Sequence, residues 1–269
     1  MASDSKRMTK KHNIIAAIQA RMGSTRLPKK ALRKIRGKTM IEIIYKRLSA
    51  CAKIDRIVLT TSISKENDIL AEHAKKIHLP CYRGSEEDLI SRYLGTFETF
   101  GASAIVRITA DCPLVDPALV DKMVSIYQKE GGTFDFFTNG SPPTFPDGLD
   151  IDILPLPLVK RLNKEVRTPL YREWLTVYIC EHPKEFRIYN MTNKKDLSPV
   201  RLTVDYKEDL QLVRKIFAAL GKNGRVFSLD QIMDYLDKRP QLLEINKKWV
   251  DAVIIRNIRS AAYHSLAPF

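Results

Sequence analysis

At residues 13–30 the chain reads NIIAAIQARMGSTRLPKK. The first eight residues are almost entirely apolar, which predicts a strand buried on both faces, as in a parallel sheet. The remaining residues form a loop with four cationic side chains, one glycine and two hydroxyl groups. Ligands of open parallel sheets bind beyond the carboxyl ends of the strands. The stretch therefore predicts a parallel sheet and a ligand site at its edge.

The rest of the chain continues the alternation of strands and helices. Further strands are predicted at 56–62, 81–83, 104–109 and 200–205, and helices at 39–50, 64–79, 86–100, 117–129 and 207–219. Ser64 is a candidate N-cap for the second of these helices. Such alternation is typical of a Rossmann-like, doubly wound α/β sheet that is mostly parallel. We expect one domain over residues 13–250, between a disordered N-terminal tail (1–12) and a C-terminal tail (251–269).

The pattern loosens between residues 131 and 193, which hold turn-rich sequence, short helices and one short strand. We interpret this segment as an inserted arm that covers substrate or forms a dimer. Its aromatic residues favour a homodimer, because obligate interfaces resemble a core cut in half. They are Phe134, Phe136, Phe137, Phe145, Trp174 and Tyr178.

Composition limits the partners of the chain. Its 269 residues carry a formal net charge of +14, which could indicate nucleic acid. However, the basic residues form no block of five and do not interleave with aromatic residues, so we expect no nucleic-acid partner. A dispersed positive charge fits small anions such as nucleotides better.

Hydropathy and cysteine usage point to a cytoplasmic protein without a membrane partner. No run of eighteen apolar residues is present, so no segment is expected to span a membrane. The first residues lack the apolar stretch of a secretory signal. The four cysteines are scattered and form no CxxC pair, which favours reduced thiols.

The loop after the first strand has the residues of a polyphosphate site. Arg21, Arg26 and Lys30 bring three positive charges, and polyphosphate oxygens require several converging donors. Ser24 and Thr25 add hydroxyl and backbone N–H groups, and Gly23 lets a ligand approach the backbone. The spacing matches neither GxxxxGK[ST] nor GxGxxG. A solvated basic loop is the alternative interpretation.

The stretch ARMGSTRLPKKALRKIRGKTMI (20–41) resembles the N-terminal signature of the cytidylyltransferases that activate acidic sugars. The 3-deoxy-manno-octulosonate type is most similar and the acylneuraminate type follows. Residues 13–220 also resemble the spore-coat polysaccharide branch of this superfamily, through YRGSEEDLISRY (82–93), VRITADCPLVDP (106–117), FPDGLDID (145–152) and VRLTVDYKEDLQLVRKIF (200–217). Lys29 departs from the signature, which usually has glycine there.

The resemblance implies a nucleotide-diphospho-sugar transferase type of fold and a defined reaction. CTP and an acidic or related sugar would give a CMP-sugar and pyrophosphate for surface polysaccharide synthesis. The residues implied in nucleotide binding are Gln19, Ala20, Arg21, Gly23, Ser24, Thr25, Arg26, Lys30, Gly84, Ser85, Asp88 and Arg92. The residues implied in catalysis are Arg21, Lys30, Asp111 and Asp205.

Two aspartates are predicted to share a Mg²⁺ ion. Asp111 and Asp205 are each placed at the end of a predicted strand, and Mg²⁺ takes oxygen ligands from one or two carboxylates together with phosphates and water. The resemblance assigns the same metal role to these positions. Alone, each aspartate could instead cap a helix or a turn; the basic loop opposite makes us favour the metal.

The substrate side is assigned to Asp147, Asp150, Asp152 and Arg172. Asp150 and Asp152 form a DxD-like pair, which could also indicate a nucleotide-sugar-dependent glycosyltransferase. A turn at Pro146-Asp147-Gly148 explains the aspartates equally well. A nucleotide-binding protein that has lost catalysis is a further alternative.

Two residues depart from the spore-coat branch. Trp174 stands where relatives have histidine, and Val177 stands where they have proline. Trp174 could stack on a sugar face or fill the core, and we favour the core. No histidine falls in a motif, so none is assigned as a general base.

Overall fold

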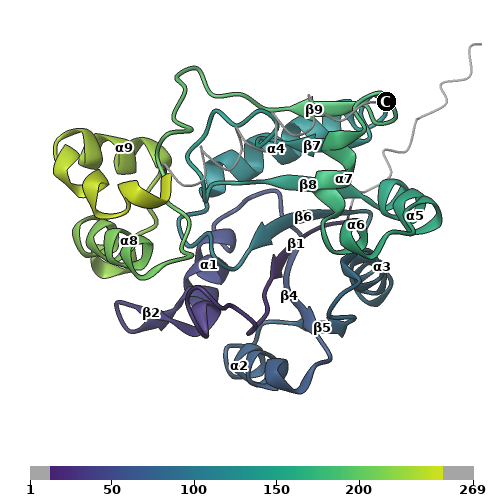
Figure 1. Cartoon of the computed structure of the whole chain (residues 1–269), viewed down its shortest axis with the longest axis horizontal. Helices are drawn as coiled ribbons and strands as arrows, with labels where there is room; N and C mark the ends of the chain where they lie inside the picture. The colour runs from purple at the N-terminus through teal and green to yellow at the C-terminus, as the bar shows by residue number, and fades with distance from the viewer. Residues whose placement is uncertain (1–12, 251–269) are drawn as a thin grey trace, which may run out of the picture.

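The computed structural model describes residues 13–250, so the two predicted tails lie outside the described residues. A seven-stranded sheet forms the centre of the molecule, in the order β5-β4-β1-β6-β8-β7-β9 (Figure 1). The strands are β1 (Ile14–Gln19), β4 (Arg56–Ser62), β5 (Cys81–Gly84), β6 (Ala104–Thr109), β7 (Phe136–Thr138), β8 (Asp152–Pro155) and β9 (Ile188–Asn190). The run from β5 to β6 is parallel, whereas β8 pairs antiparallel with β6. This arrangement confirms the Rossmann-like α/β fold.

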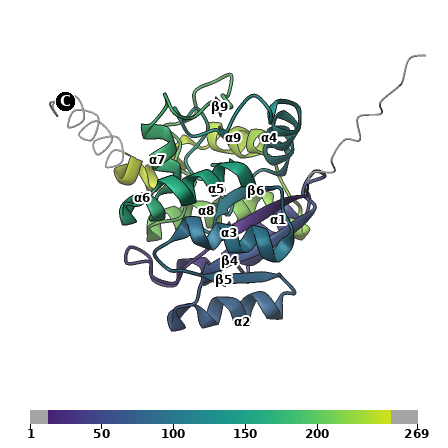
Figure 2. The ribbon, with the colours of Figure 1, turned by 90° about the vertical axis from the view of Figure 1, so that its right-hand side faces the viewer.

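Helices cover both faces of the sheet. They are α1 (Met40–Leu48), α2 (Asp68–Lys76), α3 (Leu89–Phe100), α4 (Pro117–Glu130), α5 (Leu156–Glu165), α6 (Pro169–Glu173), α7 (Leu175–Glu181), α8 (Lys207–Leu220) and α9 (Leu229–Asp237). Strand β1 alternates between two cores: Ile14 and Ile18 pack with α1, α4 and α8, whereas Ile15 packs with α3 and α5. Figure 2 shows α3 and α5 together on the second face. Burial on both faces explains why β1 is apolar throughout.

The helix starts follow local capping chemistry. Thr39 and Glu42 form a capping box at α1, and Asp88 caps α3 by accepting a hydrogen bond from the Ser91 N–H. The prediction that Ser64 caps a helix is wrong, because its side chain makes no capping bond. A 3-10 turn, η2 (Lys65–Asn67), follows it and α2 begins only afterwards.

The segment 131–193 was expected to form an inserted arm, but it is part of the central sheet. It contributes β7, β8 and β9 to the central sheet, together with α5, α6 and α7. These strands have only three or four residues, too few to produce a clear alternation in the sequence. The proposed dimer role of this segment stays a prediction.

Residues 200–205 do not form the predicted strand. They are extended but have one isolated bridge, between Arg201 and Asp147. The Leu202 N–H donates to the Asp147 carbonyl and the Val204 N–H donates to the Asp111 carbonyl. The segment therefore lies against loops instead of a strand, and its place beside Asp111 brings Asp205 to the same edge of the sheet.

Candidate active site

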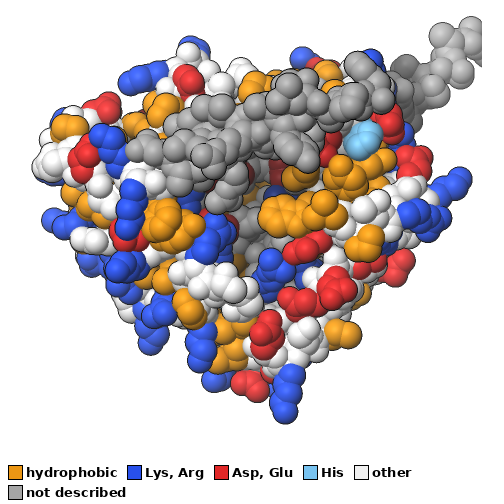
Figure 3. All heavy atoms as spheres, in the orientation of Figure 1, with side chains coloured by type: hydrophobic (Ala, Val, Ile, Leu, Met, Phe, Trp, Pro, Cys, Tyr) orange, Lys and Arg blue, Asp and Glu red, His pale blue; other side chains and the backbone are white. Residues whose placement is uncertain are grey.

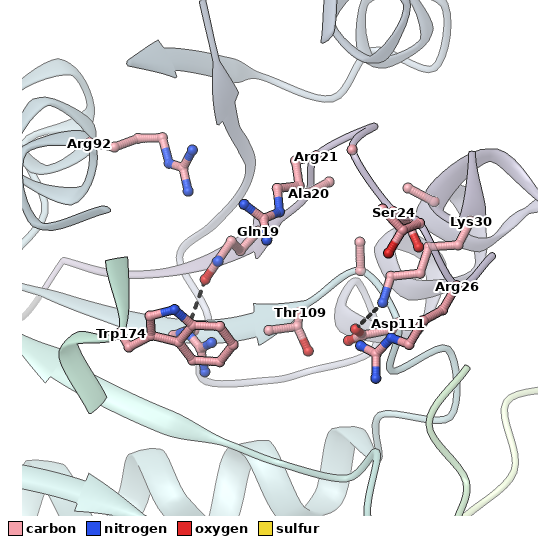
Figure 4. A pocket seen from close by; sticks show the side chains of 15 residues that line it. Gln19, Ala20, Arg21, Ser24, Arg26, Lys30, Arg92, Thr109, Asp111 and Trp174 are labelled. Carbon is pink, nitrogen blue, oxygen red and sulfur yellow. Dashed lines mark hydrogen bonds and ion pairs between the residues drawn. The ribbon is translucent and has the colours of Figure 1, made fainter. Parts of the chain in front are cut away.

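A cavity of about 270 Å³ opens at the carboxyl ends of β1 and β6 (Figure 4). Ten residues predicted from the sequence line it: Gln19, Ala20, Arg21, Gly23, Ser24, Thr25, Arg26, Lys30, Arg92 and Asp111. Arg107, Thr109 and Trp174 also belong to the wall. The loop after the first strand thus faces a cavity, as a ligand-binding loop should.

Hydrogen bonds hold the loop in place. The Met22 N–H donates to Oδ1 of the fully buried Asn67 at 2.7 Å, and the Leu27 N–H donates to Ser24 Oγ at 3.3 Å. Lys29 lies in the left-handed region (φ 58°, ψ 31°) just before the 3-10 turn η1 (Lys30–Leu32). This conformation explains the glycine expected at position 29, since glycine has no Cβ to strain it.

Lys30 lies between the two aspartates that were predicted to bind metal. Its Nζ is 2.5 Å from Asp111 Oδ2 and 2.7 Å from Asp205 Oδ1. Burial alone would lower the pKa of Lys30, but the two carboxylates raise it above its ordinary value. Burial alone would raise the pKa of Asp111, but the charge of Lys30 holds it below its ordinary value. Arg26 reaches the same Asp205 oxygen at 2.9 Å. The ammonium group therefore stays charged at the inner end of the cavity.

A second cation fixes Asp205 from behind. Arg201, 4% exposed, contacts Asp205 at 3.2 Å and the fully buried Asp209 at 3.1 Å. Asp209 also accepts hydrogen bonds from the Asp205 N–H, at 3.0 Å, and from the Asn246 side chain, at 2.9 Å. Sequence analysis did not identify Arg201 as an organiser of the site, because a single arginine among the residues before a predicted helix is not distinctive.

Asp147 and Asp150 lie beside the cavity but do not line it. Asp147 pairs with Arg201 at 2.5 Å, and Asp150 accepts the Gly148 N–H at 3.1 Å. Burial raises the pKa of Asp147, and neighbouring carboxylates raise it further. Burial also raises the pKa of Asp150, to about 6. Asp111 is among the neighbouring carboxylates that raise both pKa values, so this edge of the site holds a cluster of carboxyl groups that repel one another when ionised.

Asp152 and Arg172, assigned to substrate, are instead engaged with protein groups. Asp152 receives hydrogen bonds from Arg107 and Thr138, each at 2.8 Å, within the sheet. Arg172 forms a two-nitrogen contact with Asp88, at 2.7 and 2.8 Å, away from the cavity wall. These pairs brace β8 and the start of α3.

Arg107 is a site residue that the sequence analysis missed. Its Nε donates to Gln19 Oε1 at 2.9 Å, and the Tyr93 hydroxyl donates to the same oxygen at 2.9 Å. Because Arg107 can only donate, the Gln19 oxygen must face it, and the amide NH₂ is the group that remains for a ligand. Its position in the sequence could have indicated this role, because Arg107 is the one charged residue in the apolar strand AIVRIT (104–109).

Arg92 lines the cavity on the side away from Lys30 and Asp111 (Figure 4). The residue is 3% exposed, its Nη1 donates to the Ser85 carbonyl at 3.0 Å, and its buried Nε has no hydrogen-bond partner among the described residues. Gly84, Ser85 and Asp88 do not line the cavity. A Cβ at Gly84 would lie 2.9 Å from a Tyr82 ring atom and 3.0 Å from Arg92 Cγ, so this glycine serves packing.

Trp174 is 51% exposed and lines the cavity, so the prediction that it fills the core is wrong. It also lines an adjoining cavity of about 90 Å³ with Glu86, Arg92 and Glu173. Glu173 pairs with Arg21 at 3.0 Å, which joins α6 to the basic loop. The aromatic face of Trp174 is therefore available to a ligand.

The carboxylate edge fits a divalent cation that binds with phosphate. Oxygens of Asp111 and Asp205 converge on one point, which the Lys30 ammonium group now occupies. Over residues 13–250 no group of three or more potential ligands forms a cage made of protein alone. Mg²⁺ does not need one, since it usually takes one or two carboxylates and completes its shell with water and substrate phosphate.

Comparison with known proteins decides the class of this site. The sequence model of the cytidylyltransferase family matches residues 15–247. The chain belongs to the cytidylyltransferase family. It is accordingly a nucleotidyltransferase, and the predicted enzyme class is confirmed. No helix of this family member, within the described residues, is long and apolar enough to cross a membrane.

Three relatives of this cytidylyltransferase are informative. The spore coat polysaccharide biosynthesis protein SpsF of Bacillus subtilis is 30% identical, over 85% of this chain and 96% of its own. A cytidylyltransferase structure from Leptospira borgpetersenii is 33% identical with a TM-score of 0.82, over 86% of this chain and 97% of that one. A CMP:2-keto-3-deoxy-manno-octonic acid synthetase structure with CTP shares the fold alone, at 18% identity and a TM-score of 0.58, over 77% and 98%.

Proposed function

We propose that this enzyme transfers CMP from CTP to an acidic or related sugar and releases pyrophosphate, as a step in making a surface polysaccharide. The observation that carries the proposal is Lys30, which lies between Asp111 and Asp205 at the inner end of the basic loop. It joins the phosphate-binding cations to the carboxylates in one site. The relationship to SpsF supports a role in polysaccharide synthesis.

Each part of the cavity has a role in this proposal. Arg21 and Arg26 attract the triphosphate and stabilise the pyrophosphate as negative charge develops on it. Lys30 moves from the aspartates to a phosphate oxygen when CTP enters. The side-chain NH₂ of Gln19 is a donor for the remaining part of the substrates. The sugar oxygen attacks the α-phosphorus, and pyrophosphate leaves.

Asp111 and Asp205 would hold a Mg²⁺ ion once Lys30 has moved. When bound, the ion supplies positive charge that neutralises the phosphates and orients the reactants. The two aspartates, held by Arg201 and by the Val204–Asp111 backbone bond, keep that position fixed. No histidine lines the cavity among residues 13–250, and we assign no protein base for the sugar hydroxyl.

The glycosyltransferase alternative has less support. It would require Asp150 and Asp152 to face a metal, but Asp152 is buried and bonded to Arg107 and Thr138. The loss-of-catalysis alternative has no support in the site, because Lys30, Asp111 and Asp205 lie within contact distance of one another.

The test is pyrophosphate release with each of CTP, ATP, GTP and UTP against a panel of acidic sugars, with Mg²⁺ present. We expect release with CTP and at least one sugar acid. Lys30→Met should abolish it, whereas the matched Lys29→Met variant should keep it, since Lys29 is exposed and does not line the cavity. Equal release in both variants would contradict the proposal.

We further infer that the enzyme is a cytoplasmic homodimer that uses the 131–193 segment. Exposed apolar side chains gather on α6 and α7: Leu170 is 61% exposed and Val177 is 39% exposed, next to Trp174. Sedimentation at micromolar concentration should show a dimer that Leu170→Glu with Val177→Glu dissociates. A monomeric parent protein would refute this inference.

A further inference from the structure

A second cavity, of about 350 Å³, lies away from the active site between the hairpin β2 (Lys34–Ile35)–β3 (Lys38–Thr39), α1 and the turn after α8. Its walls combine apolar and cationic groups and contain no acidic residue. They are formed by Ile35, Arg36, Lys38, Ile43, Lys46, Arg47, Phe217, Gly221, Asn223, Gly224, Arg225 and Val226. In Figure 3, Lys and Arg side chains gather on the side of the molecule that carries the hairpin and α8.

Arg47 is a buried charge in this wall. The residue is 2% exposed; its Nε donates to the Val115 carbonyl and its Nη2 to the Phe227 carbonyl, each at 2.7 Å. The charge of Asp116 acts on it favourably, but no carboxylate of residues 13–250 forms an ion pair with it. No hydrogen bond from Nη1 is found within the described part of the chain. Burial lowers the pKa of Arg47 to about 10. Because burial outweighs the favourable charge of Asp116, the guanidinium is not fully compensated, and a bound anion at this wall would stabilise it further.

The rim of the cavity also carries positive charges that are not paired with carboxylates. Arg36, Lys46 and Arg225 form no ion pair with any carboxylate of residues 13–250, whereas most cations around the active site are paired. A Cβ on Gly224 would lie 2.6 Å from Lys46 Nζ, so the ammonium group lies against the turn that bounds the cavity. The floor, by contrast, is apolar, with Ile35, Ile43 and Phe217.

We propose that this cavity binds a small organic phosphate whose apolar or planar body rests on Phe217 and Ile43 and whose phosphate meets Arg47, Lys46 and Arg225. A phosphate matches several converging cationic donors, and a volume near 300 Å³ or more is typical of small-molecule sites. This binding activity is separate from nucleotidyl transfer.

The location would let such a ligand contact the framework of the active site. The hairpin follows η1, which begins at Lys30, and Arg47 bonds the carbonyls of Leu114 and Val115, a few residues after Asp111. One wall of the second cavity is therefore continuous in sequence with Lys30, and another is bonded to the loop that carries Asp111.

The probe is 1-naphthyl phosphate, titrated by calorimetry in the absence of nucleotide. We expect one saturable site, which Lys46→Glu with Arg225→Glu weakens by about tenfold or more because two favourable charges become unfavourable. Lys30→Met, which changes the active site only, should keep the affinity within about twofold. Lys160→Glu with Lys164→Glu, two exposed charge changes on α5, makes the same change in net charge and is the control. Melting curves verify that each variant is folded, and Arg47 is left intact because its removal could unfold the protein.

Two further ligands test the chemical class. 1-Naphthol lacks the charge and inorganic phosphate lacks the apolar body, and each should bind at least about tenfold more weakly than the probe. No saturable binding of 1-naphthyl phosphate up to millimolar concentration would overturn the proposal. So would a loss of binding in Lys30→Met but not in the Lys46/Arg225 variant, or equal affinity for either simpler ligand.

Discussion

Two charged networks meet at Asp205, and they differ mainly in burial. In one, Lys30 joins Asp111 and Asp205, with side chains that are 16%, 22% and 12% exposed. In the other, Arg201 joins Asp205 to Asp209, and the arginine is 4% exposed and Asp209 fully buried. Similar ion pairs therefore serve different purposes: the open network can exchange partners with a ligand, and the closed one cannot.

The difference follows from the number of bonds on each group. Asp209 receives hydrogen bonds from Arg201, Asn246 and two backbone N–H groups, so its charge is fully compensated inside the protein. Within residues 13–250, Lys30 is bonded through its side chain to the two aspartates alone, at a cavity wall. A ligand phosphate can replace the carboxylates around Lys30, and Asp111 and Asp205 would then be available to a metal cation, as proposed above.

Removal of Arg201 should have the largest effect. Arg201→Met leaves Asp209 buried without its cation, and breaking a buried pair in this way costs about 3–5 kcal/mol. Urea denaturation should show this loss of unfolding free energy. The control is Arg21→Met, whose half-exposed pair with Glu173 is expected to contribute less than about 1 kcal/mol. Similar stability in both variants would contradict the distinction between the networks.

The two aspartates of the open network should separate activity from stability. Asp111→Asn is expected to reduce turnover about a hundredfold or more, equal to about 3 kcal/mol of transition-state stabilisation, with little change in melting temperature. Asp205→Asn should lose activity similarly and also about 1–3 kcal/mol of stability, because it breaks the contact with Arg201. Paired measurements of kcat and melting temperature test this. Full activity in either variant would remove that aspartate from the catalytic site.

Trp174 should affect the acceptor sugar more than the fold. Trp174→Ala removes an exposed ring from the cavity wall, so we expect stability within about 0.5 kcal/mol of the parent. The KM for the sugar should rise about five- to tenfold, equal to about 1 kcal/mol, while CTP binding is unchanged. Trp174→His reintroduces the residue of the spore-coat branch and should change which sugar is preferred. An unchanged sugar profile in both variants would exclude contact with the acceptor.

Lys29→Gly should have the smallest effect, and a favourable one. Lys29 has φ 58°, and a left-handed conformation costs a residue with a Cβ about 1–2 kcal/mol. Part of this gain is offset by the greater freedom of glycine in the unfolded chain, so we expect about 0.5–1 kcal/mol of added stability. Lys34→Gly, in strand β2, is the control and should destabilise. A loss of stability in Lys29→Gly would contradict the inference that the left-handed conformation of Lys29 destabilises the protein.

Local sequence patterns were sufficient to predict the strand and the loop that form the active site. The apolar run before Gln19 predicted β1, and the residues after it predicted a basic loop at the edge of the sheet; both follow from neighbours in the chain. The aspartates at 111 and 205 were expected together and are joined by Lys30. Their catalytic and metal-binding roles remain predictions that the variants above address.

The sequence by itself determined the class of fold, the phosphate-facing loop and the membership in a family of nucleotidyltransferases, because burial periodicity and a contiguous motif are local properties. Only the tertiary structure decided which distant charges pair. It turned Arg172 toward Asp88, Asp152 toward Arg107, and Trp174 toward the cavity instead of the core. The physical reason is that a side chain's partner depends on which segments pack beside it, and residues 84 or 45 positions apart leave no periodic trace in the chain.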